Sequence, residues 1–178
     1  MVFRAKDSRL TSRLVKAMGQ VKNLDTSSVR GERNVAEGLT NATAIAVLEG
    51  FDFNARASFG SILNSTVTVD DVTGKISIAT YNALEQMRSP EGATHFSLQA
   101  GFLSIDFATG GYELAQSPEE VYALENVLIS PTLLPDTAPT LVGTKMHLVL
   151  IEFFQEINGV RYMLNNGAFN VLNLVKIS

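Results

Sequence analysis

The chain has 178 residues, enough for one domain with a substantial core, and a net charge of −4. It contains no cysteine, which excludes disulfides, thiolate nucleophiles and Cys-ligated metal centres. Charged residues make up only 18% of the chain, which favours a protein that is partly covered by a partner, although a β protein rich in Thr, Ser and Asn explains the same figure.

We expect a protein of the cytoplasm or of a virion. The start of the chain lacks the apolar stretch of a secretory signal. No run of about 18 apolar residues, the length that spans a membrane, occurs anywhere.

The charge is distributed unevenly along the sequence. Residues 1–33 hold eight of the 14 Lys and Arg and three Asp and Glu, so this segment carries about +5. The other residues include six Lys and Arg and 15 Asp and Glu, about −9. Such asymmetry is typical of a tail that interacts with something of opposite charge.

Residues 1–40 are predicted to form this basic arm, with a short helix over 8–18. Asp7 or Ser8 can cap the helix, Gly19 is expected to end it, and residues 25–40 are interpreted as a connecting loop. The helix carries a narrow apolar stripe that must pack on a surface, either of its own chain or of a neighbour, and that consists of Leu10, Leu14, Val15 and Met18.

After residue 40 the pattern becomes that of β structure. Residues 61–69 and 75–80 predict a hairpin around the turn at 70–74. Alternation over 94–100 and 102–107 predicts two strands with a bulge or bend near Ala100-Gly101, where the apolar phase shifts. Ser117-Pro118 is typical of a helix start and equally of a turn.

The C-terminal part gives the clearest signals. A long strand is predicted over 145–157, and Asn158-Gly159 predicts a tight hairpin turn before the returning strand at 160–164. A second turn at 165–167 and a last strand at 169–177 follow. About eight strands at short spacing predict a mainly β domain over 41–178, an antiparallel β-sandwich or barrel.

Residues that carry chemistry are few and scattered. His95 falls on the polar face of an expected strand, and His147 lies in an apolar strand where a hydrogen-bonded core residue is the simpler interpretation. Asp70 and Asp71 could offer oxygens to calcium, but EF-hand spacing is absent and adjacent acids are ordinary turn formers. With no phosphate loop and no Gly-x-Ser-x-Gly motif, we expect no catalytic, metal or cofactor site, and therefore no enzyme.

Several stretches resemble a group of uncharacterised small β-rich bacterial proteins of similar length. They are Arg30–Val35, Leu48–Asn54, Phe153–Gly159 and Leu164–Asn170. The resemblance spans most of the chain. It implies a similar β-rich fold but no activity and no functional residue, because that group has no assigned activity.

The sequence favours a structural protein that self-assembles into a filament, tube or shell. In this hypothesis the arm docks on the acidic β body of a neighbouring copy, through Leu10, Leu14, Val15 and Met18 with Arg4, Arg9, Arg13 and Lys16. The alternative is a monomeric or dimeric binding module that holds a protein or glycan with its loops, 130–143 among them. A weaker alternative is nucleic-acid binding by the arm through its positive charge. With one aromatic residue, Phe3, the arm offers no platform on which bases could stack.

Overall fold

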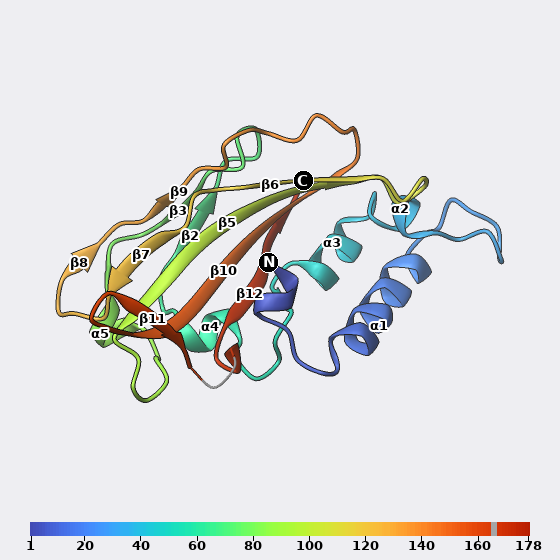
Figure 1. Ribbon diagram of the computed structural model, residues 1–178. Helices are drawn as coiled ribbons and strands as arrows, with labels where there is room; N and C mark the ends of the chain where they lie inside the picture. Colours follow the sequence, from blue (N-terminus) through green and yellow to red (C-terminus); the bar gives the residue numbers. More distant parts are fainter. Residues whose placement is uncertain (165–166) are drawn as a thin grey trace.

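The computed structural model describes residues 1–164 and 167–178. Its centre is a twisted antiparallel sheet with the strand order β1-β12-β10-β5-β6, to which β11 is added beside β10 and β7 beside β5 (Figure 1). The strands of this central sheet are β1 (Phe51–Asp52), β5 (His95–Ile105), β6 (Tyr112–Gln116), β7 (Glu120–Ala123), β10 (Thr144–Ile157), β11 (Val160–Met163) and β12 (Val171–Ile177).

The two longest strands, β5 and β10, form the middle of the sheet. Their pairing runs unbroken from Thr144 beside Ile105 to Phe154 beside His95. Because both faces of the sheet are covered, β10 is buried continuously from Met146 to Phe154. Its sequence there is mostly apolar and does not alternate between apolar and polar residues. The long strand expected over 145–157 is confirmed.

The two strands predicted over 94–100 and 102–107 are one strand, β5, and the bulge predicted between them is wrong. The apparent change of phase arises because β5 buries residues on both of its faces. A register shift does occur in the sheet, but it lies between β10 and β12, at His147 and Leu148.

One face of the central sheet is covered mostly by short strands, and we call it the strand-covered face. Its apolar core joins Phe96 and Leu98 of β5 and Ile151 of β10 to Ile76 and Leu133 of the covering layer. The covering elements are α4 (Phe59–Ile62), β2 (Val67–Val69), β3 (Ile76–Ile78), β4 (Tyr81–Asn82), α5 (Ala83–Gln86), β8 (Leu128–Ile129) and β9 (Thr132–Leu133).

The opposite face, the helix-covered face, carries the N-terminal elements. Leu150 of β10 and Leu172 of β12 pack there against Val21 and Leu48, two residues of the covering helices. The covering elements are the short turn η1 (Val2–Arg4) and the helices α1 (Leu10–Asn23), α2 (Val35–Gly38) and α3 (Ala42–Leu48). The N-terminal segment is therefore part of the folded core, in contact with its own sheet (Figure 1).

The helical segment extends further than the sequence suggested. Gly19 does not end α1, which continues to Asn23. The 25–40 connection contains α2, and α3 adds a helix just beyond it at 42–48. The helical covering of the sheet therefore crosses the boundary expected at residue 40.

The predicted turns have mixed outcomes. The β2–β3 hairpin around 70–74 is confirmed, although residues 59–62 at its expected start form α4. Ser117-Pro118 does not start a helix, because a strand, β7, follows it, and Ser117 Oγ accepts a hydrogen bond from the Ala100 amide at 2.9 Å.

The C-terminal hairpin follows the sequence closely. Asn158 (φ 52°) and Gly159 (φ 77°) form the tight turn between β10 and β11 in the left-handed conformation that these residue types tolerate. Two residues of the next expected turn, 165–166, lie outside the described residues. The last strand begins at Val171, two residues later than expected.

The fold is mainly β with antiparallel sheets, as predicted, but the barrel alternative is wrong. The central sheet remains open, with β1 at one end of its strand order and β6 at the other. The described residues form twelve strands in three sheets, where about eight were expected, because strands of two or three residues leave almost no periodic signal. None of the described helices is long and apolar enough to cross a membrane.

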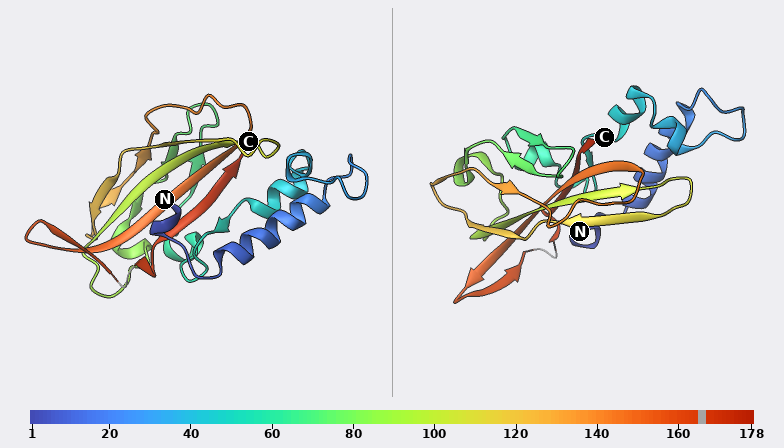
Figure 2. Two further views of the ribbon diagram at one scale, coloured as in Figure 1. Left: turned by 45° about the vertical axis from the view of Figure 1, so that its right-hand side comes forward. Right: turned by 90° about the horizontal axis from the view of Figure 1, so that it is seen from above.

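The molecule is elongated, and its two ends are built differently. The far part of α1 and the loop that follows it form one end, whereas α5, β8 and the β10–β11 hairpin lie at the other (Figures 1 and 2). We call these the arm end and the hairpin end.

Candidate functional site

The apolar stripe predicted on the arm faces its own chain for the most part. Leu10 is buried, Met18 packs against the core of the helix-covered face and Leu14 is half-buried. Val15 points outward with 67% of its surface exposed. The stripe therefore finds its surface in cis, and docking of the arm on a neighbour stays a prediction.

The four basic residues predicted for the interface divide into two pairs. Arg13 donates to the carbonyl oxygens of Asp52 (2.7 Å) and Phe53 (3.0 Å) and pairs with Asp7, so it fastens α1 to the start of the sheet. Arg4 pairs with a carboxylate of β10, as described next. The other two, Arg9 and Lys16, are exposed and have no ion-pair partner among the described residues.

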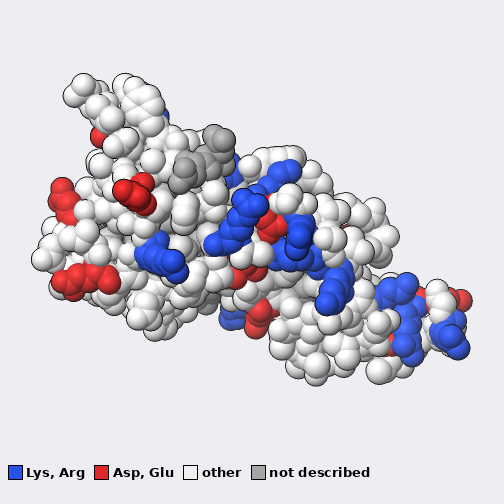
Figure 3. Space-filling model, turned by 90° about the horizontal axis from the view of Figure 1, so that it is seen from below, with Lys and Arg blue, Asp and Glu red and all other residues white. Residues whose placement is uncertain are grey.

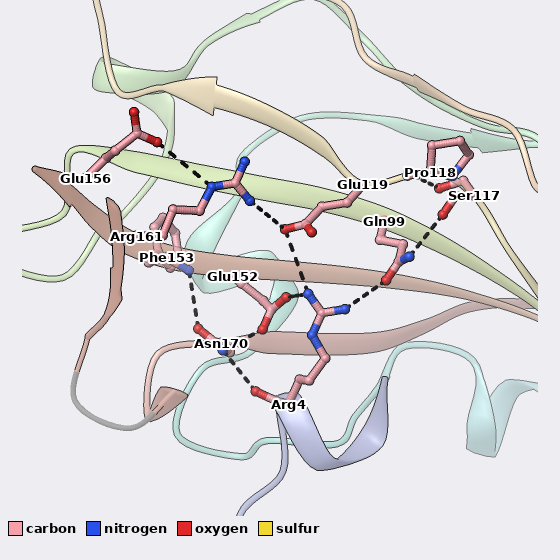
Figure 4. Close-up of polar contacts among 10 residues, drawn as sticks. All are labelled: Arg4, Gln99, Ser117, Pro118, Glu119, Glu152, Phe153, Glu156, Arg161 and Asn170. Carbon is pink, nitrogen blue, oxygen red and sulfur yellow. Dashed lines mark hydrogen bonds and ion pairs between the residues drawn. The ribbon is translucent and has the colours of Figure 1, made fainter. Parts of the chain in front are cut away.

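A polar network occupies a cleft of about 330 Å³ between η1, β7 and the β10–β11 hairpin (Figure 4). Arg4 forms an ion pair with Glu152 of β10 and donates to Gln99 Oε1 at 3.0 Å. Glu119 Oε1 lies 3.8 Å from Arg4 and 3.7 Å from Arg161, so it bridges the two guanidinium groups.

Glu152 is the most buried carboxylate of the network, with 10% of its side chain exposed. Burial raises its pKa, and the neighbouring Arg4 opposes this shift. Asn170 donates to Glu152 Oε1 (3.3 Å) and to the Arg4 carbonyl (2.9 Å). The network therefore ties the N-terminal turn to the centre of the sheet, and its carboxylates are already paired.

The two histidines lie apart. His95 stacks on Phe154 and its Nδ1 lies 2.9 Å from the Thr94 hydroxyl. His147 is fully buried and stacks on Phe102, with Nε2 3.3 Å from Ser178 Oγ and 3.6 Å from Asp71. His147 Nδ1 has no hydrogen-bond partner among the described residues, so the expected core role is only partly satisfied.

The acidic turn after β2 behaves as a turn. Asp70 accepts hydrogen bonds from the amides of Val72 and Thr73, and these bonds lower its pKa. Asp71 points elsewhere and pairs with Lys176 Nζ at 2.6 Å. Among residues 1–164 and 167–178, no three His, Asp or Glu side chains gather in a way that could hold a metal ion.

The arm end exposes basic side chains on a rigid support. Asp25 is buried and accepts hydrogen bonds from Ser27, Ser28 and Asn34, which fixes the loop after α1. Burial alone would raise the pKa of Asp25, but these hydrogen bonds lower it overall. The exposed basic side chains of this end, Lys16, Lys22, Arg30 and Arg33, outnumber its exposed acidic ones, Glu32 and Glu37. Val15 and Val29 are exposed there as well.

The hairpin end has an excess of acidic side chains despite the exposed Arg88, and sequence reasoning missed it. Pairing of β4 with β8 brings together three exposed apolar residues, Leu84 (57%), Val127 (56%) and Leu128 (67%). The acidic side chains exposed at this end are Glu85, Glu91 and Glu125. Like the basic side chains of the arm end, they have no ion-pair partner within the described part of the chain.

Comparison of the chain with protein-family models, with curated proteins and with solved structures finds no match. The resemblance to small bacterial proteins therefore stays a prediction.

Proposed function

We propose that the protein is a non-enzymatic structural subunit that assembles head to tail, with the arm end of one copy against the hairpin end of the next. The observation that carries the proposal is the opposite excess of unpaired charge at the two ends of an elongated molecule. Figure 3 shows most of the Lys and Arg of one face between its middle and the arm end, whereas Asp and Glu lie toward the other end and also among these basic side chains.

The proposed contact joins two different surfaces of the molecule. A contact between two different surfaces of the same chain is heterologous, and it produces rings or filaments rather than a simple symmetric dimer. The expected trans contact thus involves the outer, basic face of α1, because the inner face of this helix already packs on its own sheet.

Exposed apolar side chains are expected to contribute most of the stability of the proposed interface. Exposed ion pairs contribute about 0–1 kcal/mol each, so a stable interface needs buried apolar area as well. Leu84, Val127 and Leu128 at the hairpin end and Val15 and Val29 at the arm end offer that area.

Charge reversal tests the proposal. An arm variant carries Lys16→Glu and Lys22→Glu, and an end variant carries Glu85→Lys and Glu125→Lys. We expect the wild type to sediment as oligomers at low salt, each variant alone to sediment as a monomer, and an equimolar mixture of the two to assemble again, because each altered surface then meets its complement. Negative-stain images show whether the restored particles are filaments or rings.

The control is Lys75→Glu, which reverses an exposed charge on the β2–β3 hairpin, away from both ends. It should assemble like the wild type. A wild type that is monomeric at low salt, or a mixture of variants that stays monomeric, would contradict head-to-tail assembly.

A further inference from the structure

A second basic region lies at the base of the arm, where α1 begins. A cleft of about 350 Å³ is lined there by Arg9, Arg13 and Arg56 together with Asp7 and Ser8. A neighbouring cleft of about 330 Å³ shares three of these residues and adds Lys6. Figure 3 views this face, on which Lys and Arg gather.

The charge of the double cleft is strongly positive. Its one carboxylate, Asp7, is engaged, since it accepts from the amides of Arg9 (2.6 Å) and Ala55 (2.8 Å) and from Arg13 (2.6 Å). These contacts hold the pKa of Asp7 below its usual range, chiefly through the Ala55 amide. Asp7 compensates Arg13 and leaves the other cations of the cleft without a carboxylate partner among the described residues.

The start of α1 at the cleft also favours an anion. The first turn of α1 contains no acidic residue, and no side chain caps it. The amide groups at a helix N-terminus carry partial positive charge and bind anions readily.

We propose that this cleft binds a phosphate group. Guanidinium groups pair with phosphate in a two-pronged geometry, and a doubly charged anion suits three cations better than a single carboxylate does. The volume exceeds that of one phosphate, so the ligand class is a phosphorylated molecule or a segment of nucleic-acid backbone. The residues that carry the site are the three cations without a carboxylate partner, Lys6, Arg9 and Arg56.

Titration of the full chain with inorganic pyrophosphate, followed by calorimetry and by amide NMR shifts, tests the site. A single-stranded oligothymidine, followed by fluorescence anisotropy, tests the nucleic-acid source of the same chemistry. Binding of pyrophosphate alone would assign a small phosphorylated ligand, and binding of the oligonucleotide alone would assign a nucleic-acid backbone. The largest NMR shifts should fall on residues 9–13 and 55–56.

Two variants probe the site without touching contacts that hold the fold. Arg9→Gln and Arg56→Gln each remove an exposed cation of the cleft. Each should weaken binding by about tenfold or more, the effect of one lost charge-assisted hydrogen bond. Lys22→Gln and Arg33→Gln, equally basic but outside the cleft, should change it less than about twofold, within the weak effect of distant exposed charges.

Two results would overturn the proposal. The first is that neither probe binds at low salt. The second is that the control variants weaken binding as much as the cleft variants do, since this would indicate attraction by net charge rather than a site. Oligomeric state, measured on the same samples, keeps this test separate from the assembly proposal.

Discussion

The two faces of the central sheet are covered in different ways. The strand-covered face is sealed by short strands over an apolar core, with the Lys176–Asp71 ion pair beside the buried His147. The helix-covered face combines an apolar core with ion pairs that fix the N-terminal segment, Arg4 to Glu152 and Arg13 to Asp7. The helix-covered face also carries the proposed phosphate cleft and the basic arm. We therefore expect the binding and assembly surfaces on this side of the sheet.

The contrast suggests a division of roles within one sheet. Apolar burial supplies most of the stability on both faces, because it scales with the area removed from water. The ion pairs determine position, because the pairing of Arg4 with Glu152 specifies where the N-terminal turn lies across β10. The following substitutions test this comparison.

The largest effects are expected from two neighbours in β10 that face opposite ways. Leu150 packs on the helices and Ile151 on the small strands, with 1% and 0% of their surfaces exposed. Leu150→Ala and Ile151→Ala should each lower the free energy of unfolding by about 2–5 kcal/mol, measured by urea denaturation. A much smaller loss for Leu150→Ala would show that the helices are a loosely attached arm.

The ion pair on the helix-covered face comes next. Arg4→Ala leaves the buried carboxylate of Glu152 without its cation and should lower the free energy of unfolding by about 1–3 kcal/mol. Arg161→Ala removes a guanidinium of the same cleft that is 47% exposed and should cost about 0–1 kcal/mol. Equal losses for the two variants would contradict the positioning role of Arg4. Adding Glu152→Gln to Arg4→Ala should recover part of the loss.

Sequence patterns predicted the parts of the fold that depend on near neighbours. Asn158-Gly159 and the β2–β3 turn specify their hairpins locally, and the long apolar run specifies β10. The alternation rule misjudged β5, because burial on both faces removes alternation. It also missed strands of two residues, which are held by tertiary pairing alone.

The candidate sites depend on contacts that no local pattern contains. Arg4 and Glu152 are 148 residues apart, and Arg56 meets the start of α1 only through the fold. The apolar residues of the hairpin end lie in one region because β4, which leads into α5 and Leu84, pairs with β8, which contains Leu128. The sequence showed that basic residues gather in the N-terminal segment and acidic residues in the rest of the chain. It did not show where in the fold the acidic side chains lie.

The two faces are expected to respond to pH in opposite directions. Burial lowers the pKa of His147, which lies on the strand-covered face, below 6.5. The negative charge of Asp71 opposes this shift, and the positive charges of Lys176 and Lys145 reinforce it. The unfolded chain then takes up a proton that the folded chain excludes, so stability present above pH 6.5 is lost as pH falls. Glu152, whose pKa is raised, stabilises the folded state at low pH and loses that contribution as pH rises.

The contribution of His147 can be isolated from the slope of melting temperature against pH. The wild-type melting temperature should fall between pH 7.5 and pH 5.5, and His147→Leu should flatten that fall. The same slope in His147→Leu as in the wild type would show that another group titrates.

The smallest effect concerns the helix-covered face alone. Gly19 lies within α1, and an added Cβ would meet no atom within 4 Å. Gly19→Ala should therefore raise the free energy of unfolding by about 0.5–1 kcal/mol and slow hydrogen exchange in α1, because alanine loses less backbone freedom in a helix. Gly159→Ala, at φ 77° in the hairpin turn, should instead lower it by about 1 kcal/mol. If Gly19→Ala also destabilised the protein, α1 would end at this glycine, as the sequence alone suggested, and the arm beyond it would not be held against the sheet.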